Sequence, residues 1–454
     1  MSYIGSTPTS QNFIAGTDYF SGTGSQTAFT LTRTVNSVND IEVTINNVPQ
    51  QPSTAYTLSG TTITFTSAPS SGTNNIYVRY LATNMQSFTV PANSINRSKL
   101  DADLQAVAVG RNRIINGAMV VDQRNAGASI VGGNNFGVDR FQTIVSQSSK
   151  YNVQQNAGSV TPPAGFTNYL GITSTSSYSV TSTDYFAIRQ FIEGYNIADL
   201  GWGTANAKTV TLSFWVYSSL TGTFGGTLQN SAQTRAYPYS YTISSVNTWE
   251  YKTVTITGET TGTWLTTNGQ GIGVYFSLGT GSSNMGTANA WSSSSALAPS
   301  GSVNLVGTSG ATFYITGVQL EEGTTATSFE REAYSVTLQK CYRYCWVLSG
   351  NGLYYPRQHV DAISSTTGIW YVQYPAAFRT TPSLTTKSIS SSTIEMSNHS
   401  NGNGPVLTSV TFGESAYQSG FVNMIAGSGW VAGSTGHWRW IGGPDANFTF
   451  SAEL

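Results

Sequence analysis

Histidines are the first residues to consider for catalysis, and this chain of 454 residues has three of them, His359, His399 and His437. None lies in an HExxH segment, in which two histidines on one helix face would bind zinc. None is next to a GxSxG segment, whose serine would be the nucleophile of a hydrolytic triad. The sequence therefore predicts no histidine-dependent active site.

Carboxylates could instead cleave glycans, because glycoside hydrolases place two of them beside the scissile bond. The C-terminal region supplies Asp361, Glu395, Glu414 and Asp445, and nothing in the sequence pairs any two of them. The glycine-rich run GGNNFG at 132–137 lacks the strand-then-helix setting of a phosphate-binding loop, so we expect a surface loop there. We predict no catalytic residues, and the chain is not expected to be an enzyme.

Aromatic side chains could bind sugar, because a ring packs on the apolar face of a pyranose while amides, carboxylates or arginines reach its hydroxyl groups. The candidates for glycan or receptor binding are Tyr354, Tyr355, Trp370, Asn401, Trp430, Trp438 and Trp440. Trp438 and Trp440 are two residues apart, hence on one face of a strand, a pattern more typical of a core. Tyr354, Tyr355 and Trp430 are flanked by glycine-rich segments, which favours exposure.

The composition indicates which elements position these side chains. Charged residues make up 9% of the chain, against roughly a quarter in an ordinary soluble domain. The 25 Tyr, 20 Phe and 10 Trp supply apolar surface for cores, and abundant Ser and Thr suit pleated strands. We predict an all-β protein of serial antiparallel β-sandwich or jelly-roll domains with two short helical connectors, because 454 residues exceed what one core usually organises.

The charge and the cysteines exclude several classes of partner. The net charge of −1 gives no field able to hold nucleic acid or an anionic membrane, and no run of about 18 apolar residues predicts membrane insertion. Residues 1–4 do not begin a basic-then-apolar leader, so signal-peptide export is not expected. Cys341 and Cys345 are the only cysteines, and we expect small buried hydrophobic side chains on one helix face rather than a disulfide framework.

The N-terminal domain is predicted to span residues 1–92, where short runs alternate apolar and polar positions, as Ile41 and Val43 do. Ser59-Gly60 and Asn46-Asn47 have the composition of two-residue hairpin turns. A small antiparallel β-sandwich follows from these signals.

A helical neck or linker is predicted at 93–112, where Leu100, Leu104 and Val107 recur at i, i+4 and i+7. One apolar stripe on a lone helix of about three turns is marginal in water, so this helix needs a partner. The partner is either the flanking domain or the same helix of neighbouring copies in a short coiled coil, and two heptads do not decide between them.

The central domain is predicted at 113–333. Long alternating strands such as VTLSFWV (210–216) and IGVYFSL (272–278) indicate a two-sheet jelly roll. The segment 279–310, rich in Gly, Ser and Thr, is expected to be a surface loop.

The C-terminal domain is predicted at 334–454. It begins with a second short helix over 334–347, in which Leu338, Cys341 and Cys345 follow helical spacing. Beyond this helix the two-residue period of β-strands returns and continues through NFTFSAEL, so we expect a third β-domain.

Three segments of the chain resemble bacteriophage tail-fibre proteins: RNRIINGAMVVDQRNAG (111–127), FGVDRF (136–141) and ITGVQLEEGTTATSFEREAYSVTLQKCYRY (315–344). In that family an NGxMxxxQR opening strand and a GVQLExGxxATxFExR closing strand bracket a jelly roll similar to carbohydrate-binding modules. The ending NFTFSAEL is similar to the DAEL terminus of these fibres, with Ser451 in place of the usual acidic residue. SGTGSQTAFTL with AYTLSGTTITFTSAP resembles an N-terminal domain of fibres from phages of photosynthetic bacteria, the cyanophages.

The resemblance implies a virion fibre that is made in the bacterial host cytoplasm and assembles as a homotrimer. Residues 1–92 would attach it to a tail, baseplate or neck protein, and residues 334–454 would face outward and bind a host-surface polysaccharide. Two alternatives stay open. One is a fibre on the neck or capsid with a structural or weakly adhesive role, and the other is a glycan-cleaving depolymerase.

A structural calcium ion is also implied, since jelly rolls of this kind often hold one between the opening loop and the last strand. The candidate ligands are Asp122, Asp139, Glu321 and Glu322. Hard carboxylate oxygens suit Ca²⁺. Salt bridges from Arg124 and Arg140 to the same carboxylates are the favoured alternative, and no other cofactor is expected.

Overall fold

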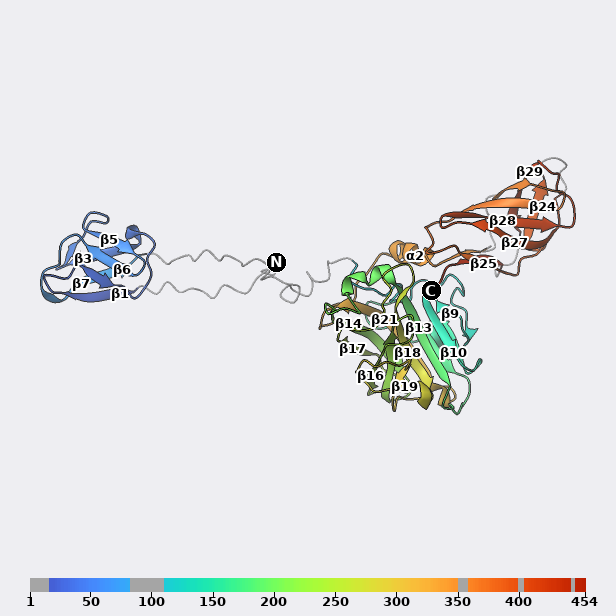
Figure 1. Cartoon of the computed structure of the whole chain (residues 1–454), viewed down its shortest axis with the longest axis horizontal. Coiled ribbons are helices and arrows are strands. Elements are labelled where there is room, and N and C mark those ends of the chain that lie inside the picture. Colours follow the sequence, from blue (N-terminus) through green and yellow to red (C-terminus); the bar gives the residue numbers. More distant parts are fainter. Residues whose placement is uncertain (1–15, 82–109, 350–357, 399–403, 442–445) are drawn as a thin grey trace. The chain divides into compact units, whose positions relative to one another are not determined.

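The structure is a computed structural model that describes residues 16–81, 110–349, 358–398, 404–441 and 446–454. The chain divides into two compact units, Met1–Lys99 and Leu100–Leu454, each described by itself below (Figure 1). Across the described ranges most regular structure is β-strand, and the paired strands are antiparallel except for the short pair β19 and β20. The predicted all-β fold class is therefore confirmed.

The N-terminal unit contains two sheets, in the strand orders β1-β7-β3-β4 and β2-β6-β5. The strands are β1 (Thr17–Gly22), β2 (Ala28–Thr30), β3 (Ile41–Ile45), β4 (Val48–Pro49), β5 (Tyr56–Ser59), β6 (Thr62–Phe65) and β7 (Gly72–Tyr80). Alternate residues such as Ile41, Val43, Ile63 and Val78 are buried in one shared core, as their spacing predicts.

The two predicted hairpin turns are both present in this unit. Asn46 and Asn47 join β3 to β4 with φ of 47° and 63°, the left-handed values that a tight hairpin turn needs. The β5–β6 hairpin pairs Ser59 with Thr62, so its turn is Gly60-Thr61, one residue later than predicted.

Two six-stranded sheets form the jelly roll of the second unit. The β13 sheet has the order β16-β15-β18-β13-β10-β9, and the β21 sheet has the order β17-β14-β21-β12-β11-β8. Their strands are β8 (Ile130–Val131), β9 (Phe136–Val138), β10 (Phe141–Val145), β11 (Tyr151–Gln155), β12 (Leu170–Ser174), β13 (Tyr185–Glu193), β14 (Val210–Ser218), β15 (Gly222–Gln229), β16 (Ala236–Ile243), β17 (Glu250–Ile256), β18 (Gln270–Thr280) and β21 (Thr312–Glu322).

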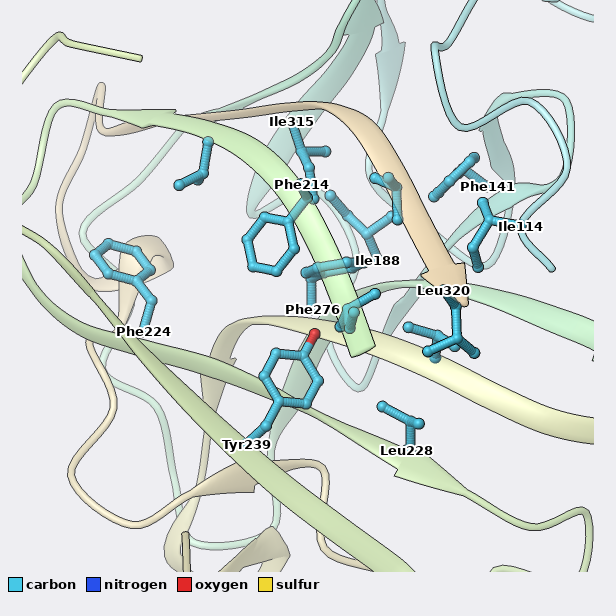
Figure 2. Close-up of a cluster of buried hydrophobic side chains, with 14 of the residues drawn as sticks. Ile114, Phe141, Ile188, Phe214, Phe224, Leu228, Tyr239, Phe276, Ile315 and Leu320 are labelled. Carbon is cyan, nitrogen blue, oxygen red and sulfur yellow. The ribbon is translucent and has the colours of Figure 1, made fainter. Parts of the chain in front are cut away.

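The core of the jelly roll lies between these sheets (Figure 2). Phe214 of β14 and Phe276 of β18 come from opposite sheets and meet edge to face, with ring centroids 5.1 Å apart. Ile188 and Ile315 are also fully buried there. Burial of each such side chain stabilises the fold by about 1.5–3 kcal/mol. The packed core therefore holds the two sheets together and fixes the positions of the side chains on their outer faces.

The segment predicted as a surface loop, 279–310, is partly a core element. Leu305 and Val306 are both fully buried, and β19 (Met285–Gly286) pairs with β20 (Ala298–Pro299). Pro299 lies so close to Gly225 that a Cβ there would be 2.5 Å from its ring. The expectation of a surface loop was therefore wrong for part of this segment. Its composition is dominated by Gly, Ser and Thr, and the few apolar residues that pack against the rest of the domain do not stand out in the sequence.

The described residues of the C-terminal region form one α-helix, α2 (Tyr334–Tyr342), and two sheets, in the orders β22-β30-β25 and β26-β29-β23-β24-β28-β27. The strands are β22 (Cys345–Ser349), β23 (Gln358–Ala362), β24 (Thr367–Gln373), β25 (Ser383–Lys387), β26 (Ile394–Asn398), β27 (Leu407–Ser415), β28 (Ser419–Ala426), β29 (Thr435–Trp440) and β30 (Asn447–Ser451). They share a core of their own.

The helix predicted over 334–347 is shorter than expected. It ends at Tyr342, because Cys345 begins β22 and pairs with Ser451 of β30. Cys341 and Cys345 are free thiols at 0% and 1% exposure, which confirms their burial, but they do not share one helix face. The described 3-10 helices are Val38–Asp40, Ala157–Ser159, Gly194–Asn196, Ala198–Leu200, Ser282–Asn284 and Leu305–Gly307.

Some predictions fall outside the described residues. The neck residues Leu100, Leu104 and Val107 are among them, as are Tyr354, Tyr355 and Asn401. Within the part of the chain that the structure describes, no helix is long and apolar enough to span a membrane.

Candidate functional site

The four tryptophans predicted to bind sugar are core residues. Trp370, Trp430, Trp438 and Trp440 are each at most 3% exposed, and Trp370 meets Trp438 edge to face at 4.8 Å. The core interpretation of Trp438 and Trp440 is thus confirmed, whereas the expected exposure of Trp430 is wrong. Sugar stacking needs an accessible ring face, so none of the four can provide it in this fold.

The four predicted calcium ligands are not gathered into one group. Among the described residues there is no cluster of three or more His, Cys, Asp or Glu side chains that could hold a metal ion. Asp122 accepts hydrogen bonds from the backbone of Asn125 and Gly127, and Asp139 accepts one from Gln123. The Asp122 carboxylate therefore stabilises a local turn, and the Asp139 carboxylate connects two segments that are sixteen residues apart in the sequence.

The other two carboxylates have partners of their own. Glu321 accepts hydrogen bonds from the backbone and hydroxyl of Thr327, and Glu322 pairs with Lys208 at 3.1 Å. Of the salt bridges offered as the alternative to calcium, Arg124 lies 3.7 Å from Asp139, while Arg140 pairs with Glu453 instead.

The NGxMxxxQR segment has a structural role. The Asn116 amide donates to the carbonyls of Val121 and Asp139, and its oxygen accepts from the Val121 backbone. A Cβ on Gly117 would lie 2.1 Å from the carbonyl oxygen of Val318, so only glycine allows this approach to β21.

The opening and closing segments of the resemblance are hydrogen-bonded to each other. Arg113 donates its backbone N–H to the Leu320 carbonyl at 2.9 Å, and the Glu330 carboxylate accepts from the Asn112 backbone at 2.7 Å. These motif residues consequently close the jelly roll.

The outer face of the β13 sheet carries a hollow. This hollow of about 360 Å³ lies over β10, β13 and β18 and under the β19–β20 segment. We call it the sheet groove, and it is lined by Asn134, Ile144, Tyr185, Arg189, Gln233, Tyr275, Asn284, Ser295 and Leu297. Its size falls within the range of small-ligand sites.

Strand register positions the centre of the sheet groove. Gln142, Arg189 and Tyr275 are directly opposite one another on the adjacent strands β10, β13 and β18, so their side chains share one row. The Nε of Arg189 donates to the Gln142 amide oxygen at 2.9 Å. The guanidinium carbon lies 4.1 Å from the Phe191 ring centre and 5.8 Å from that of Tyr275, which holds the cation in place by cation–π attraction.

The aromatic residues of the groove differ in exposure. Tyr275 is 1% exposed and forms the floor, and burial raises the pKa of its hydroxyl. Tyr185 is half-buried and stands at one end of the same strand face as Arg189. Tyr185 therefore presents a ring that a sugar can reach, beside the amides of Asn134, Gln233 and Asn284.

The rim of the groove is fixed by Asp184, the residue before Tyr185. Its carboxylate accepts hydrogen bonds from Ser146, Tyr178 and Thr181. Burial raises the pKa of the Asp184 carboxyl, but these hydrogen bonds outweigh that effect and hold the pKa at about 2. Its backbone carbonyl accepts from Gly281 at 2.9 Å, which ties the start of the covering segment to β13.

No protein-family model matches the sequence, and no curated protein matches it. Among solved structures, a CBM4 carbohydrate-binding module is 16% identical with a TM-score of 0.23, over 46% of this chain and 98% of that one. The enzymatically active domain of tailspike protein 4 from bacteriophage CBA120 is 13% identical with a TM-score of 0.25, over 47% of this chain and 22% of that one. A family 11 carbohydrate-binding module of a Clostridium thermocellum cellulase is 12% identical with a TM-score of 0.22, over 44% and 99%. At these scores the similarities carry no weight for function.

The chemistry that the sheet groove can support is binding. An accessible tyrosine ring, a stacked arginine and three amides are the groups that bind the apolar face and the hydroxyl groups of a sugar. None of these residues was among the predicted binding residues, although a signal exists in YFAIRQFIE (185–193). Its even positions carry the apolar residues Phe186, Ile188 and Ile192, which are buried in the core. Its odd positions include Tyr185, Arg189 and Phe191, which are half-buried on the other face.

A second accessible aromatic surface lies in the C-terminal region. Tyr371 of β24 is 59% exposed, faces Phe421 of β28 at 6.4 Å, and borders an open hollow of about 450 Å³ that also contains Gln373 and Glu414. These are not the aromatic residues that the sequence singled out. This surface has no arginine in its lining and is more open than the sheet groove.

Proposed function

We propose that this chain is a bacteriophage fibre protein that attaches to host cells by binding a surface glycan in the sheet groove. The observation that carries the proposal is the groove itself, where Tyr185, Arg189, Asn134 and Asn284 line one hollow of about 360 Å³. Stacking on a ring combined with hydrogen bonds to hydroxyl groups is how a protein holds a sugar without transforming it.

The virion part of the proposal is supported by the sequence resemblance to tail fibres. Two of the three resembling segments, 111–127 and 315–344, are hydrogen-bonded neighbours in the structure, as expected if they form one structural signature. In this proposal residues 1–92 attach to a tail, baseplate or neck protein and the fibre is a homotrimer on the virion. Binding then involves the jelly roll, in addition to or in place of residues 334–454.

Glycan binding by the full-length chain is the direct test. We expect the recombinant protein to bind a host-surface polysaccharide on an array and to compete with phage for infection. The variant Tyr185→Ala should bind about tenfold more weakly, because it removes the accessible ring of the groove. The matched control is Tyr251→Ala, which removes a 42% exposed tyrosine from the other sheet.

The same binding assay compares the sheet groove with the second aromatic surface, around Tyr371. If Tyr371→Ala abolishes binding while Tyr185→Ala does not, the receptor site belongs to residues 334–454 and the sheet groove is not the site. If the full-length protein neither binds host polysaccharide nor blocks infection, the attachment role is wrong.

Two other functions are separated by simple measurements. A fibre fixed to the neck or capsid predicts that labelled protein is found at the collar or head of intact particles. A depolymerase predicts that polysaccharide shortens on incubation with the protein, and our proposal expects its length to stay constant.

A further inference from the structure

Arg189 is the one charged side chain among the described residues that line the sheet groove, and none of those residues is acidic. Its Nε donates a hydrogen bond to the neutral amide of Gln142, and its stacking partners are the rings of Phe191 and Tyr275. Within the described part of the chain no carboxylate forms an ion pair with it.

The contacts of Arg189 differ from those of most arginines in the Leu100–Leu454 unit. In that unit, arginines that form salt bridges with a carboxylate are Arg111, Arg113, Arg124, Arg140, Arg235, Arg343 and Arg439. Most arginines of this unit are thus neutralised in pairs, whereas Arg331 and Arg379 donate to backbone carbonyl groups. A half-buried guanidinium fixed between rings and an amide is, by contrast, a site prepared for an anion.

We infer that the sheet groove binds a carboxylated glycan, one that carries uronic or similarly acidic sugar residues. This inference rests on the proposed glycan-binding function and adds the charge of the ligand. The planar guanidinium matches a carboxylate in a two-point hydrogen bond, while Tyr185 packs on the sugar ring that carries it. The Gln142 contact and the two rings hold the guanidinium in place before the ligand arrives.

The test uses the full-length protein and pairs of polymers that differ in charge alone. The probes are polygalacturonate and alginate, each with its carboxyl-reduced form, and dextran sulfate with dextran. We expect binding of an acidic polymer that falls at least tenfold on carboxyl reduction and weakens as salt is raised from about 50 mM to 500 mM.

Variants of Arg189 assign the effect to the groove. Arg189→Gln should remove the preference for the carboxylated form, and Arg189→Lys should retain part of it, because the charge remains but the two-point geometry is lost. The matched control, Arg79→Gln, removes an exposed arginine of the N-terminal unit and should leave binding unchanged. Thermal unfolding of each variant confirms that it is folded, and the comparison of polymers on the unaltered protein needs no variant.

The binding results distinguish failure of the carboxylate inference from failure of the proposed function. Equal binding of a carboxylated polymer and its reduced form, or binding of a neutral polymer alone, would overturn the inference and leave the proposed function standing. Binding of dextran sulfate without either uronic polymer would overturn the carboxylate assignment. Binding of no polymer, acidic or neutral, would count against both the inference and the proposed function.

Discussion

Replacing Glu453 with glutamine should destabilise the Leu100–Leu454 unit, because this carboxylate completes a buried network of four charges. Glu453 accepts hydrogen bonds from Arg124 at 3.0 Å and from Arg140, and Arg124 also lies 3.7 Å from Asp139. All four side chains are at most 15% exposed. Two guanidinium groups and two carboxylates thus balance one another away from water.

The magnitude follows from what the substitution leaves behind. A hydrogen bond between charged groups contributes about 1.5–3 kcal/mol, and Glu453→Gln weakens two of them. Arg140 also packs over the Tyr344 ring at 3.6 Å and keeps that contact. Breaking a buried pair typically costs 3–5 kcal/mol, and the glutamine oxygen retains part of the bonding, so we expect a loss of about 3 kcal/mol.

Differential scanning calorimetry and chemical denaturation of the full-length protein measure this loss. The matched control is Glu322→Gln, whose partner Lys208 is 44% exposed, and an exposed pair of this kind contributes about 0–1 kcal/mol. Adding Arg140→Met to Glu453→Gln should give less than the sum of the single losses, since the uncompensated charge is then removed. If Glu453→Gln destabilises the protein no more than Glu322→Gln does, the buried network is not what stabilises this end of the chain.

Three further predictions concern stability. Burial raises the pKa of Asp139 to about 6 against the opposing effect of Arg124, so the native state holds its proton from about pH 4 to 6. Stability should therefore fall by up to about 3 kcal/mol as pH rises through that window, and the fall should vanish in Asp139→Asn, measured by denaturation at each pH. Gly117→Ala should lower the melting temperature by forcing apart the opening segment and β21, at about 1–3 kcal/mol. Trp438→Ala should cost about 3–5 kcal/mol in denaturant unfolding, as a core residue does, and a small loss would show that the ring is a surface group.

Much of the fold could be predicted because its signals are local. Val210, Leu212, Phe214 and Val216 alternate along one strand and are all fully buried, as a period of two requires. The Asn46-Asn47 turn was equally readable, since asparagine tolerates the left-handed conformation that a tight hairpin needs.

Helix and strand boundaries that depend on distant pairing could not be read in the same way. Cys345 fits the helical spacing of the segment before it, but its backbone pairs with Ser451, more than a hundred residues later. A ladder partner so far along the chain leaves no trace in the local pattern, and tertiary pairing overrides helix propensity there.

The error on Trp430 has a similar origin. Its glycine-rich neighbours suggested an exposed loop, but the ring is buried against Gly368 and Gly436, where a Cβ would lie 2.8 Å and 2.7 Å from the indole. The informative glycines are therefore those of other strands, whose missing side chains make room for the ring. Composition near a residue cannot reveal such a partner.

The proposed trimer makes a last prediction, which concerns affinity. A single sheet groove offers one accessible tyrosine ring, one arginine and a few amides, so we expect weak binding of a free oligosaccharide. A homotrimer would present three such grooves, and a polysaccharide repeats its epitope along one chain, so later binding events become intramolecular. Apparent affinity for surface-bound polysaccharide, measured by biosensor, should then exceed that for a free oligosaccharide in calorimetry by a factor of about 100 or more. Equal affinities in the two assays would contradict multivalent binding, and a monomer in light scattering would remove its structural basis.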